Sequence, residues 1–437
     1  MEIKNNMRRD VYIVDGARTP FLKAKGKPGK FSASDLAVNV GRELLSRQPF
    51  SPEDLDEVII GCMMPSADEA NIARLIALRL GCGKSMPAYT VQRNCASGMQ
   101  SIDSAVKDIA LGRHDLVLAG GTEAMSRAPL LFNDGMVNWL AGLWSAKGVA
   151  AQFKQWAKFR PSNLSPVIAL LKGLTDPTVN LNMGQTAENV AYRFGITREQ
   201  MDLFALESHK RVAAAQDEHH FSDILAAFDY AGGVYTEDDG VRRDSTLEKL
   251  STLKPIFDKK FGSVTAGNSS QVTDGAALLL LASKEAVKKY NLSVLARVVD
   301  TEWSGLEPAE MGLGPVYAST ALLKRYGMRL DDINYWEINE AFAAQVLGCL
   351  AAWEDDDYCR THLGLDKAFG RIDPNHLNID GGAVALGHPV GASGARIVLR
   401  LANILKRTNT QRGVATICIG GGQGGAMLIE NVSEVTL

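Results

Sequence analysis

Several features that would assign this 437-residue chain to a specialised class are missing from its sequence. Its six cysteines form no Cys-x-x-Cys pair and no Cys/His group with the spacing of a zinc site. It has no uncharged apolar run of about 18 residues or more, so we expect no membrane-spanning helix. The segment Met1–Asp10 is polar and lacks the apolar core of a signal peptide. These absences predict free thiols in a reducing, bacterial-type cytoplasm.

An excess of basic charge is also lacking. The chain carries 47 basic and 50 acidic residues, for a formal net charge of -3. Proteins that bind nucleic acid along their surface usually have a basic balance, so the composition argues against that class. With 46% hydrophobic and 22% charged residues, the chain has the composition of a globular protein. At about 150 residues per domain, its length predicts about three domains or subdomains.

Glycine, in contrast, is abundant, with 41 residues. Glycines cluster where short apolar runs end, at 120–121, 381–382 and 420–422. A strand that runs into a glycine turn and then a helix is typical of α/β proteins. The patterns predict strands at 11–14, 58–60, 116–119, 294–299, 335–338 and 414–419, and helices at 34–45, 99–111 and 395–405.

The two ends of the chain resemble each other. CASG at 95–98 opens a predicted helix and LVLAGG follows at 116–121; GASG at 391–394 opens another and TICIGG follows at 416–421. This pattern predicts a duplicated α/β half. The expected division is an N-terminal half at 1–285 and a C-terminal half at 290–437, with the N-terminal copy interrupted at about 126–184.

The interruption at 126–184 matches neither copy. It contains acids only at Asp134 and Asp176. We expect an inserted loop subdomain with amphipathic helices. Its tryptophans and basic residues are Trp139, Trp144, Trp156, Arg127, Lys147, Lys154, Lys158, Arg160 and Lys172.

Cys95, in the motif NCASG, precedes a predicted helix. The helix dipole and the unpaired N–H groups at that end stabilise a thiolate, the nucleophilic form of cysteine. The small residues that follow favour the approach of a substrate. The alternative is a small buried apolar side chain, which is the commoner role of an unspecified cysteine.

His388 and Cys418 each lie in a glycine-rich stretch. His388 is followed by a proline in GHP, which favours a fixed ring acting as base or oxyanion donor. Cys418 begins CIGGGQGG, with more glycines than one turn needs. The backbone N–H groups of such a run bind an oxyanion or a phosphate. The alternatives are a structural histidine and a tight turn requiring positive φ.

Asn339 opens the motif NEAF after an apolar strand, where α/β proteins tend to bind ligands. The alternative role is that of a helix N-cap. The small residues between Val264 and Ala277 would allow an extended ligand to lie close to the backbone.

Together, these motifs and their order resemble the thiolase family over nearly the whole chain, from VDGARTPF at 14–21 to Met427. The resemblance implies two similar α/β halves stacked as a five-layer α-β-α-β-α sandwich with an inserted loop subdomain. It also implies a homodimer or homotetramer, no bound cofactor, and coenzyme A as a co-substrate.

The resemblance further implies ping-pong acyl transfer between 3-oxoacyl-CoA and CoA. Cys95 would carry the acyl group, His388 would help to deprotonate the Cys95 thiol, and Cys418 would serve as acid and base. Asn339 would hold a water in one oxyanion hole, while the N–H groups of Cys95 and Gly420 would form the other. The expected substrate contacts are Ser270 (pantetheine), Arg242 (near the adenine), Ala266, Ala341, Phe342, Met183 and Asn182.

Two departures bear on specificity. Short-chain acetoacetyl-CoA thiolases have a histidine where this chain has Asn182, which indicates a pocket for longer acyl chains. The segment 127–175 is longer and more hydrophobic than in those enzymes and resembles a fatty-acid β-oxidation subunit. It is either a lid lining the acyl tunnel or a surface for a partner subunit or membrane.

The motifs also bear on two other functions. A ketosynthase-type condensing enzyme usually lacks a second cysteine such as Cys418. A non-catalytic lipid carrier would be expected to lose Cys95, His388 or Cys418, and all three are present. A short-chain acetyl-CoA acetyltransferase is the nearest alternative.

Overall fold

The same strand order occurs twice in the computed structural model, which describes residues 9–432. Most of the polar segment Met1–Asp10 therefore lies outside the described residues. The N-terminal order is β4 (Ala88–Val91), β3 (Glu57–Gly61), β5 (Leu116–Ala124), β12 (Thr273–Ser283), β1 (Val11–Arg18). The C-terminal order is β14 (Tyr335–Ile338), β15 (Arg412–Ile419), β16 (Gln423–Glu430), β13 (Ala296–Gly305). A single parallel bridge between Trp336 and Leu377 stands where the N-terminal half has β4. The predicted α/β duplication is confirmed.

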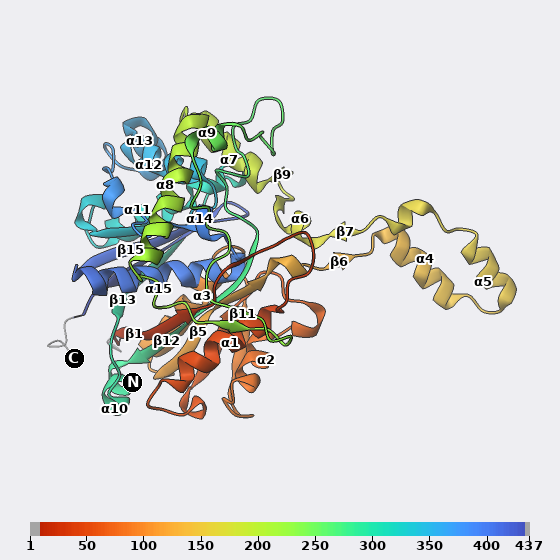
Figure 1. The fold of residues 1–437 in the computed structure, drawn as a ribbon, viewed down its shortest axis with the longest axis horizontal. Coiled ribbons are helices and arrows are strands. Elements are labelled where there is room, and N and C mark those ends of the chain that lie inside the picture. The colour runs from red at the N-terminus through yellow and green to blue at the C-terminus, as the bar shows by residue number, and fades with distance from the viewer. Residues whose placement is uncertain (1–8, 433–437) are drawn as a thin grey trace, which may run out of the picture.

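The two halves join at one short seam. β1 pairs antiparallel with β13 through Val11 and Val298, Tyr12 and Arg297, and Ile13 and Ala296. Helices then fill three layers around the two halves of the sheet (Figure 1). The outer N-terminal layer holds α1 (Ala33–Ser46) and α2 (Ile72–Arg79), the middle layer α3 (Ser97–Ala110) and α15 (Val390–Thr408), and the outer C-terminal layer α11 (Gly314–Arg325) backed by α12 (Ala343–Glu354). This is the expected five-layer sandwich.

The two middle helices cross where neither carries a side chain. A Cβ at Gly98 would lie 2.8 Å from the Gly391 carbonyl oxygen, and one at Gly394 would lie 2.6 Å from the Met99 amide nitrogen. Ala96 and Ser97 are fully buried. The expectation that these small residues open a path for substrate is therefore wrong for Gly98. Its lack of a side chain permits close contact between α3 and α15.

The remaining described elements surround this core. The helices are α7 (Met183–Arg193), α8 (Arg198–Asp217), α9 (Leu247–Ser251), α10 (Lys284–Tyr290), α13 (Asp356–Leu363) and α14 (Ala383–Leu386). The short strands are β2 (Leu22–Lys23), β8 (Thr175–Asp176), β9 (Leu181–Asn182), β10 (Ala227–Phe228) and β11 (Val234–Tyr235). Within residues 9–432, none of the helices combines the length and apolar character needed to cross a bilayer.

The insert forms a helical hairpin that projects from the body (Figure 1). Its helices α4 (Asp134–Ser145) and α5 (Val149–Trp156) stand on β6 (Leu130–Leu131) and β7 (Val167–Ile168), and α6 (Ala169–Gly173) follows at the base. The ring of Trp139 lies 4.9 Å from that of Trp156 and 5.1 Å from that of Phe159. Trp139 Nε1 also donates to the Gln155 carbonyl at 3.1 Å. The hairpin thus has a small core of its own.

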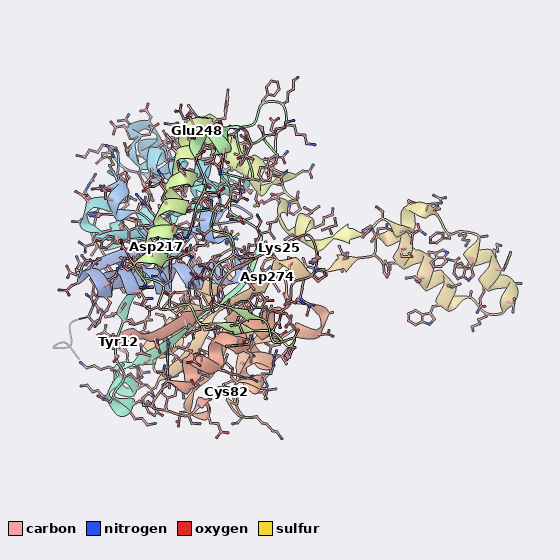
Figure 2. All side chains as sticks on the ribbon, in the orientation of Figure 1. Tyr12, Lys25, Cys82, Asp217, Glu248 and Asp274 are labelled. Atoms are coloured by element: carbon pink, nitrogen blue, oxygen red, sulfur yellow. The ribbon has the colours of Figure 1, made fainter. Side chains whose placement is uncertain are left out.

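The lid interpretation is wrong for α4 and α5, because these helices extend away from the body rather than over it (Figure 1). Figure 2 shows their side chains standing clear of the rest of the molecule. Trp144 is 93% exposed and Phe153 is 77% exposed. Only the base of the insert lines the cavity described next, through Leu171, Leu174 and Thr175.

Candidate active site

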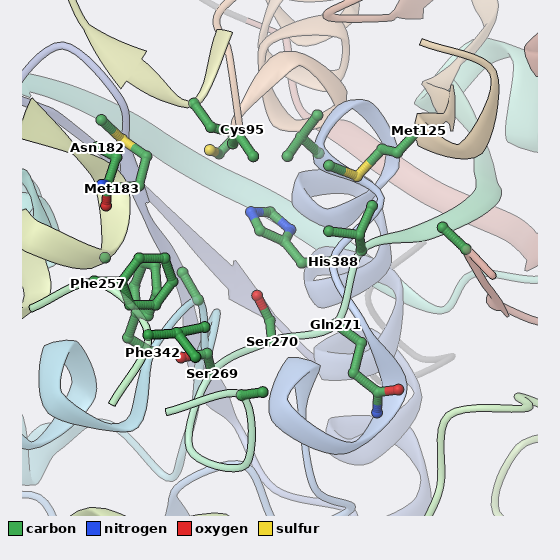
Figure 3. A pocket seen from close by; sticks show the side chains of 18 of the residues that line it. Cys95, Met125, Asn182, Met183, Phe257, Ser269, Ser270, Gln271, Phe342 and His388 are labelled. Atoms are coloured by element: carbon green, nitrogen blue, oxygen red, sulfur yellow. The ribbon is translucent and has the colours of Figure 1, made fainter. Parts of the chain in front are cut away.

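A cavity of about 720 Å³ lies between the halves, at the base of the hairpin. Residues from both halves reach it, and Figure 3 shows Cys95, His388 and Ser270 turned toward the same space. Ten of the twelve expected site residues line it: Cys95, His388, Cys418, Ser270, Arg242, Ala266, Ala341, Phe342, Met183 and Asn182. Asn339 and Gly420 are not among the residues that line it.

Cys95 lies in the turn that leads into α3, with Ala96 at the N-cap position. Burial raises the pKa of the Cys95 thiol above its usual range, and the N–H groups of Gly420 and of Cys95 itself oppose that rise. The donors expected at the helix end are therefore present, but burial outweighs them. The thiol keeps its proton at neutral pH and needs a base to become a nucleophile.

His388 has the properties of that base. Burial, together with the positive charge of Arg396, lowers the pKa of His388 to about 3, so the ring is neutral. Its Nδ1 lies 2.6 Å from Ser393 Oγ, and the Ser393 hydroxyl donates to the Pro389 carbonyl at 3.1 Å. Since that hydroxyl proton is directed at the carbonyl, we assign the ring proton to Nδ1. Nε2 is then unprotonated and has no hydrogen-bond partner in the described part of the chain.

Cys418 is the last residue but one of β15, and its side chain is buried. Burial raises the pKa of Cys418 well above its usual range, and charge on Cys95 raises it further. Cys418 therefore holds its proton more firmly than an exposed cysteine. Such a group donates a proton to a strong base that forms beside it, such as a carbanion or enolate.

Most of the glycines after Cys418 serve the turn and its packing. Gly421 and Gly422 have φ angles of +92° and +75°, and the Gly314 backbone occupies the space where a Gly424 side chain would lie. The alternative of a tight turn that requires positive φ therefore applies to Gly421 and Gly422. Within this run, the Gly420 N–H is the group that acts on Cys95, since it lowers the pKa of the thiol.

Asn339 is fully buried, and neither its Oδ1 nor its Nδ2 has a hydrogen-bond partner among residues 9–432. The alternative role as a helix cap is wrong, because α12 begins at Ala343 and Phe342 occupies its N-cap position. Glu340 is a structural anchor that accepts from Ser208 Oγ at 2.7 Å and from Asn378 Nδ2 at 2.8 Å. A buried amide without partners is costly unless a ligand or water binds it.

The small-residue segment and the NEAF motif form one wall. The Ser270 N–H donates to the Ala341 carbonyl at 2.9 Å, and Ser269 forms an isolated antiparallel bridge with Phe342. Phe342 packs edge-on against Phe257, with ring centroids 5.9 Å apart. Ser269, Ser270, Ala341 and Phe342 therefore line the cavity together with Cys95, His388 and Cys418.

Comparison with known proteins decides the family. The model "Thiolase, N-terminal domain" matches residues 11–285, and "Thiolase, C-terminal domain" matches residues 292–431. The chain belongs to the thiolase family. The rat mitochondrial 3-ketoacyl-CoA thiolase is 39% identical over 97% of this chain and 99% of the relative. The acetyl-CoA acetyltransferase of Allochromatium vinosum is 34% identical over 98% and 100%, respectively.

Solved thiolase structures agree with this assignment. The crystal structure of human mitochondrial 3-ketoacyl-CoA thiolase in complex with CoA is 37% identical, with a TM-score of 0.83 over 98% of this chain and 99% of that chain. The Bacillus anthracis acetyl-CoA acetyltransferase is 36% identical, with a TM-score of 0.82 over 98% and 100%. The expected thiolase fold is therefore confirmed.

Sequence analysis missed part of this thiolase's cavity. Lys23 lines it together with Arg242, and burial and the charge of Arg242 both lower the pKa of Lys23. Two cations at one cavity favour an anionic ligand group. The apolar remainder gave no sequence signal, since ordinary core residues look the same: Met125, Leu171, Leu174, Ile256, Phe257, Val272, Met311 and Val390.

Proposed function

We propose that this chain catalyses the thiolytic cleavage of 3-oxoacyl-CoA and its reversal, most readily in fatty-acid β-oxidation. One observation carries the proposal: a neutral His388 with an unpaired Nε2 shares one buried cavity with two protonated cysteines, Cys95 and Cys418. Acyl transfer through a thioester needs a nucleophile, a base for it, and a second proton donor.

In the first half-reaction, His388 Nε2 takes the Cys95 proton and the sulfur attacks the keto carbon. The bond between Cα and Cβ breaks, and its electron pair passes to the acetyl-CoA enolate. Cys418 protonates that enolate, so acetyl-CoA leaves and the acyl group stays on Cys95. Two protonatable groups are needed because the protons move at different atoms.

In the second half-reaction, the thiol of free CoA gives its proton to the Cys418 thiolate and attacks the acyl-Cys95 carbonyl. The thioester bond to Cys95 breaks, and an acyl-CoA two carbons shorter leaves. The Cys95 sulfur regains its proton from His388. Both cysteines and the histidine end in their starting forms.

Negative charge develops on two oxygens during these steps. We place the acyl-enzyme oxygen against the N–H groups of Cys95 and Gly420, which already face the sulfur. We place the thioester oxygen against His388 and a water held by Asn339, whose buried amide lacks a partner within the described region. Donors of this kind each lower a barrier by ~3 kcal/mol.

We propose that CoA lies along the wall made by Ser270, Ala266 and Ala341, with Ser270 contacting the pantetheine. Arg242 and Lys23 would then meet its phosphates near the adenine. The support is the extended wall and the placement of both cations at the cavity. CoA is a co-substrate in this scheme, and no bound cofactor is needed.

The acyl chain is assigned to the apolar end of the cavity, between Met183, Leu171 and Leu174. The Asn182 side chain accepts from the Gln185 N–H at 3.0 Å and so caps α7. A cavity of about 720 Å³ with an apolar wall favours chains longer than acetoacetyl. The short-chain acetyltransferase remains the alternative, because relatives with either name match over the full chain.

We further propose that the α4–α5 hairpin binds an anionic lipid surface. Its exposed apolar residues Trp144, Val149 and Phe153 lie beside Lys147 and other cations. Aromatic side chains enter the boundary of a bilayer, and lysines are attracted to anionic headgroups. Binding to a β-oxidation partner subunit is the competing outcome. Assembly as a homodimer or homotetramer and a cytoplasmic location stay predictions.

The deciding experiment measures thiolysis of 3-oxoacyl-CoA with four, eight and sixteen acyl carbons, in the wild type beside Cys95→Ala. Activity that disappears in the variant supports the proposal, and preference for the longer substrates supports β-oxidation. Preference for four carbons favours the acetyltransferase. CoA binding without thiolysis of any chain contradicts the proposal.

A further inference from the structure

We propose that Asn94 is a positioning residue that holds the backbone of Gly420 in place, so that the Gly420 N–H can bind the acyl-enzyme oxyanion. The inference rests on the proposed function and adds a residue that the catalytic scheme does not use. The observation is one hydrogen bond between the halves: Asn94 Nδ2 donates to the Gly420 carbonyl at 2.8 Å.

The need for such a contact comes from the turn that follows β15. Gly420, Gly421 and Gly422 carry no side chains, and the last two have positive φ angles. Gly422 packs closely against Leu306 and Pro308, whereas a side chain at Gly420 would meet only Met183 and Asn94.

The Gly420 N–H is also a group that lowers the pKa of the Cys95 thiol. The carbonyl that Asn94 binds belongs to the next peptide unit, so the contact restrains the Gly420 backbone from its C-terminal side. A small rotation about the φ or ψ bond of Gly420 would move the N–H donor away from the oxygen it must bind.

The far end of the turn is held by other contacts. The Leu306 N–H donates to the Gly422 carbonyl at 2.8 Å, and Arg93 donates to Gln423 Oε1 at 3.2 Å. The Arg93 guanidinium in turn stacks on the Trp303 ring, 4.3 Å from its centroid. Asn94 therefore anchors the near end, directly beside the nucleophile.

The backbone at Asn94 explains part of its identity but not all of it. Its φ is +43°, a left-handed conformation that glycine adopts easily and asparagine tolerates. Glycine would meet the backbone requirement without making the bond to Gly420. The side chain is therefore the feature to test, and substitution by glycine removes it without adding backbone strain.

Asn291 offers a matched control. It too has a left-handed backbone, with φ of +50°, but it ends α10 at an exposed position. Asn94→Gly and Asn291→Gly thus make the same chemical change in the same backbone conformation. Asn94→Asp keeps the size of the side chain but places a carboxylate oxygen against the Gly420 carbonyl.

The experiment follows acylation of Cys95 by 3-oxooctanoyl-CoA in a single turnover, so that product release does not mask the step. We expect Asn94→Gly to slow acylation about tenfold with an unchanged KM for CoA, because one oxyanion donor is displaced rather than removed. Asn291→Gly should match the wild type. Asn94→Asp should slow acylation further and raise the pH midpoint of Cys95 alkylation by iodoacetamide by about one unit, since a carboxylate disfavours a nearby thiolate.

Wild-type acylation rates in both Asn94→Gly and Asn94→Asp would overturn the positioning role. So would equal slowing in Asn291→Gly, which would trace the effect to general loosening of the fold. A wild-type chain that is alkylated at Cys95 but cleaves no 3-oxoacyl-CoA contradicts the proposed function alone. In that case, the pH midpoint of Cys95 alkylation in Asn94→Asp tests the positioning role, and an unshifted midpoint overturns that role.

Discussion

The cavity and the hairpin are both incomplete within the described chain, but in opposite ways. In the site, polar atoms are buried without partners between residues 9 and 432, as at Asn339 and His388 Nε2. In the hairpin, apolar side chains outside its small core are exposed, as at Trp144 and Phe153. Buried polar groups call for a polar ligand, and exposed apolar groups call for an apolar surface. The two regions should therefore respond independently to mutation.

The largest expected effect is that of Cys95→Ala on the cavity. Removing the nucleophile should lower kcat for thiolysis by more than about 10,000-fold, since no acyl-enzyme forms. Steady-state assays measure the loss, and vesicle flotation should show unchanged membrane binding. Loss of vesicle binding in this variant would mean that the cavity and the hairpin are coupled.

His388→Ala should lower kcat by about 1,000-fold, because the neutral thiol of Cys95 loses its base. Ser393→Ala is the companion variant, since it removes only the hydrogen bond at Nδ1. It should lower kcat about tenfold, because the tautomer of the His388 ring is no longer fixed. Equal effects of both variants would contradict a direct role for the ring.

The hairpin gives the next effect. The double variant Trp144→Ser and Phe153→Ser should weaken binding to phosphatidylserine vesicles about tenfold or more, because two exposed aromatic groups no longer enter the lipid. Thiolysis of a short substrate should be unchanged. The control is Tyr192→Ser, which removes an equally exposed ring from the body of the molecule. A buried residue such as Met99 is not a suitable control.

Unchanged vesicle binding in the hairpin variant would exclude the lipid proposal. If Tyr192→Ser reduces binding as much, the attraction belongs to the whole surface rather than the hairpin. Recovery of a specific partner subunit by the wild type alone would favour the competing interpretation.

The smallest expected effect concerns pH. Because the pKa of His388 is held at about 3, kcat/KM should change less than about twofold as pH falls through 6.5, where an exposed histidine titrates. The effect of pH on the stability of the fold is opposite in sign to the effect expected for a salt-bridged histidine. The unfolded chain takes up the proton first, so the folded state loses stability as pH falls below about 6.5.

A fall in kcat/KM centred near pH 6.5 would show that His388 titrates as an exposed group, contrary to its burial. The His388→Ala variant then identifies the group, since the midpoint should vanish with the ring. Differential scanning calorimetry across the same pH range tests the stability statement.

Sequence predicted the parts of this fold that follow from local pattern. The repeated GASG-type motif predicted the starts of α3 and α15. The strand predicted at 335–338 matches β14 in full. The periodic apolar pattern at 395–405 covers only part of α15, which runs from Val390 to Thr408; the small residues of GASG mark its start but carry no apolar pattern. The pairing between β1 and β13 joins segments that are far apart in the chain, so no local sequence pattern predicts it.

The site residues could be predicted where the residue type is rare in its sequence context, and could not be predicted where it is common. Cys95, His388 and Cys418 stand out because thiols and imidazoles in glycine-rich stretches are unusual. The direction of the Cys95 pKa shift was not predictable, since it depends on burial by distant segments. Leu171 and Leu174 look like any amphipathic helix, and only the fold shows that they face the cavity while Trp144 does not.

The crossing of α3 and α15 at Gly98 and Gly394 also constrains how the two repeats can evolve. In the proposed mechanism, the nucleophile belongs to the first repeat, whereas the base and the acid belong to the second. Neither repeat alone would then hold the full set of catalytic groups. A side chain added at Gly98 or Gly394 would collide with the backbone of the other helix, so a substitution in one copy should displace the functional residues of both.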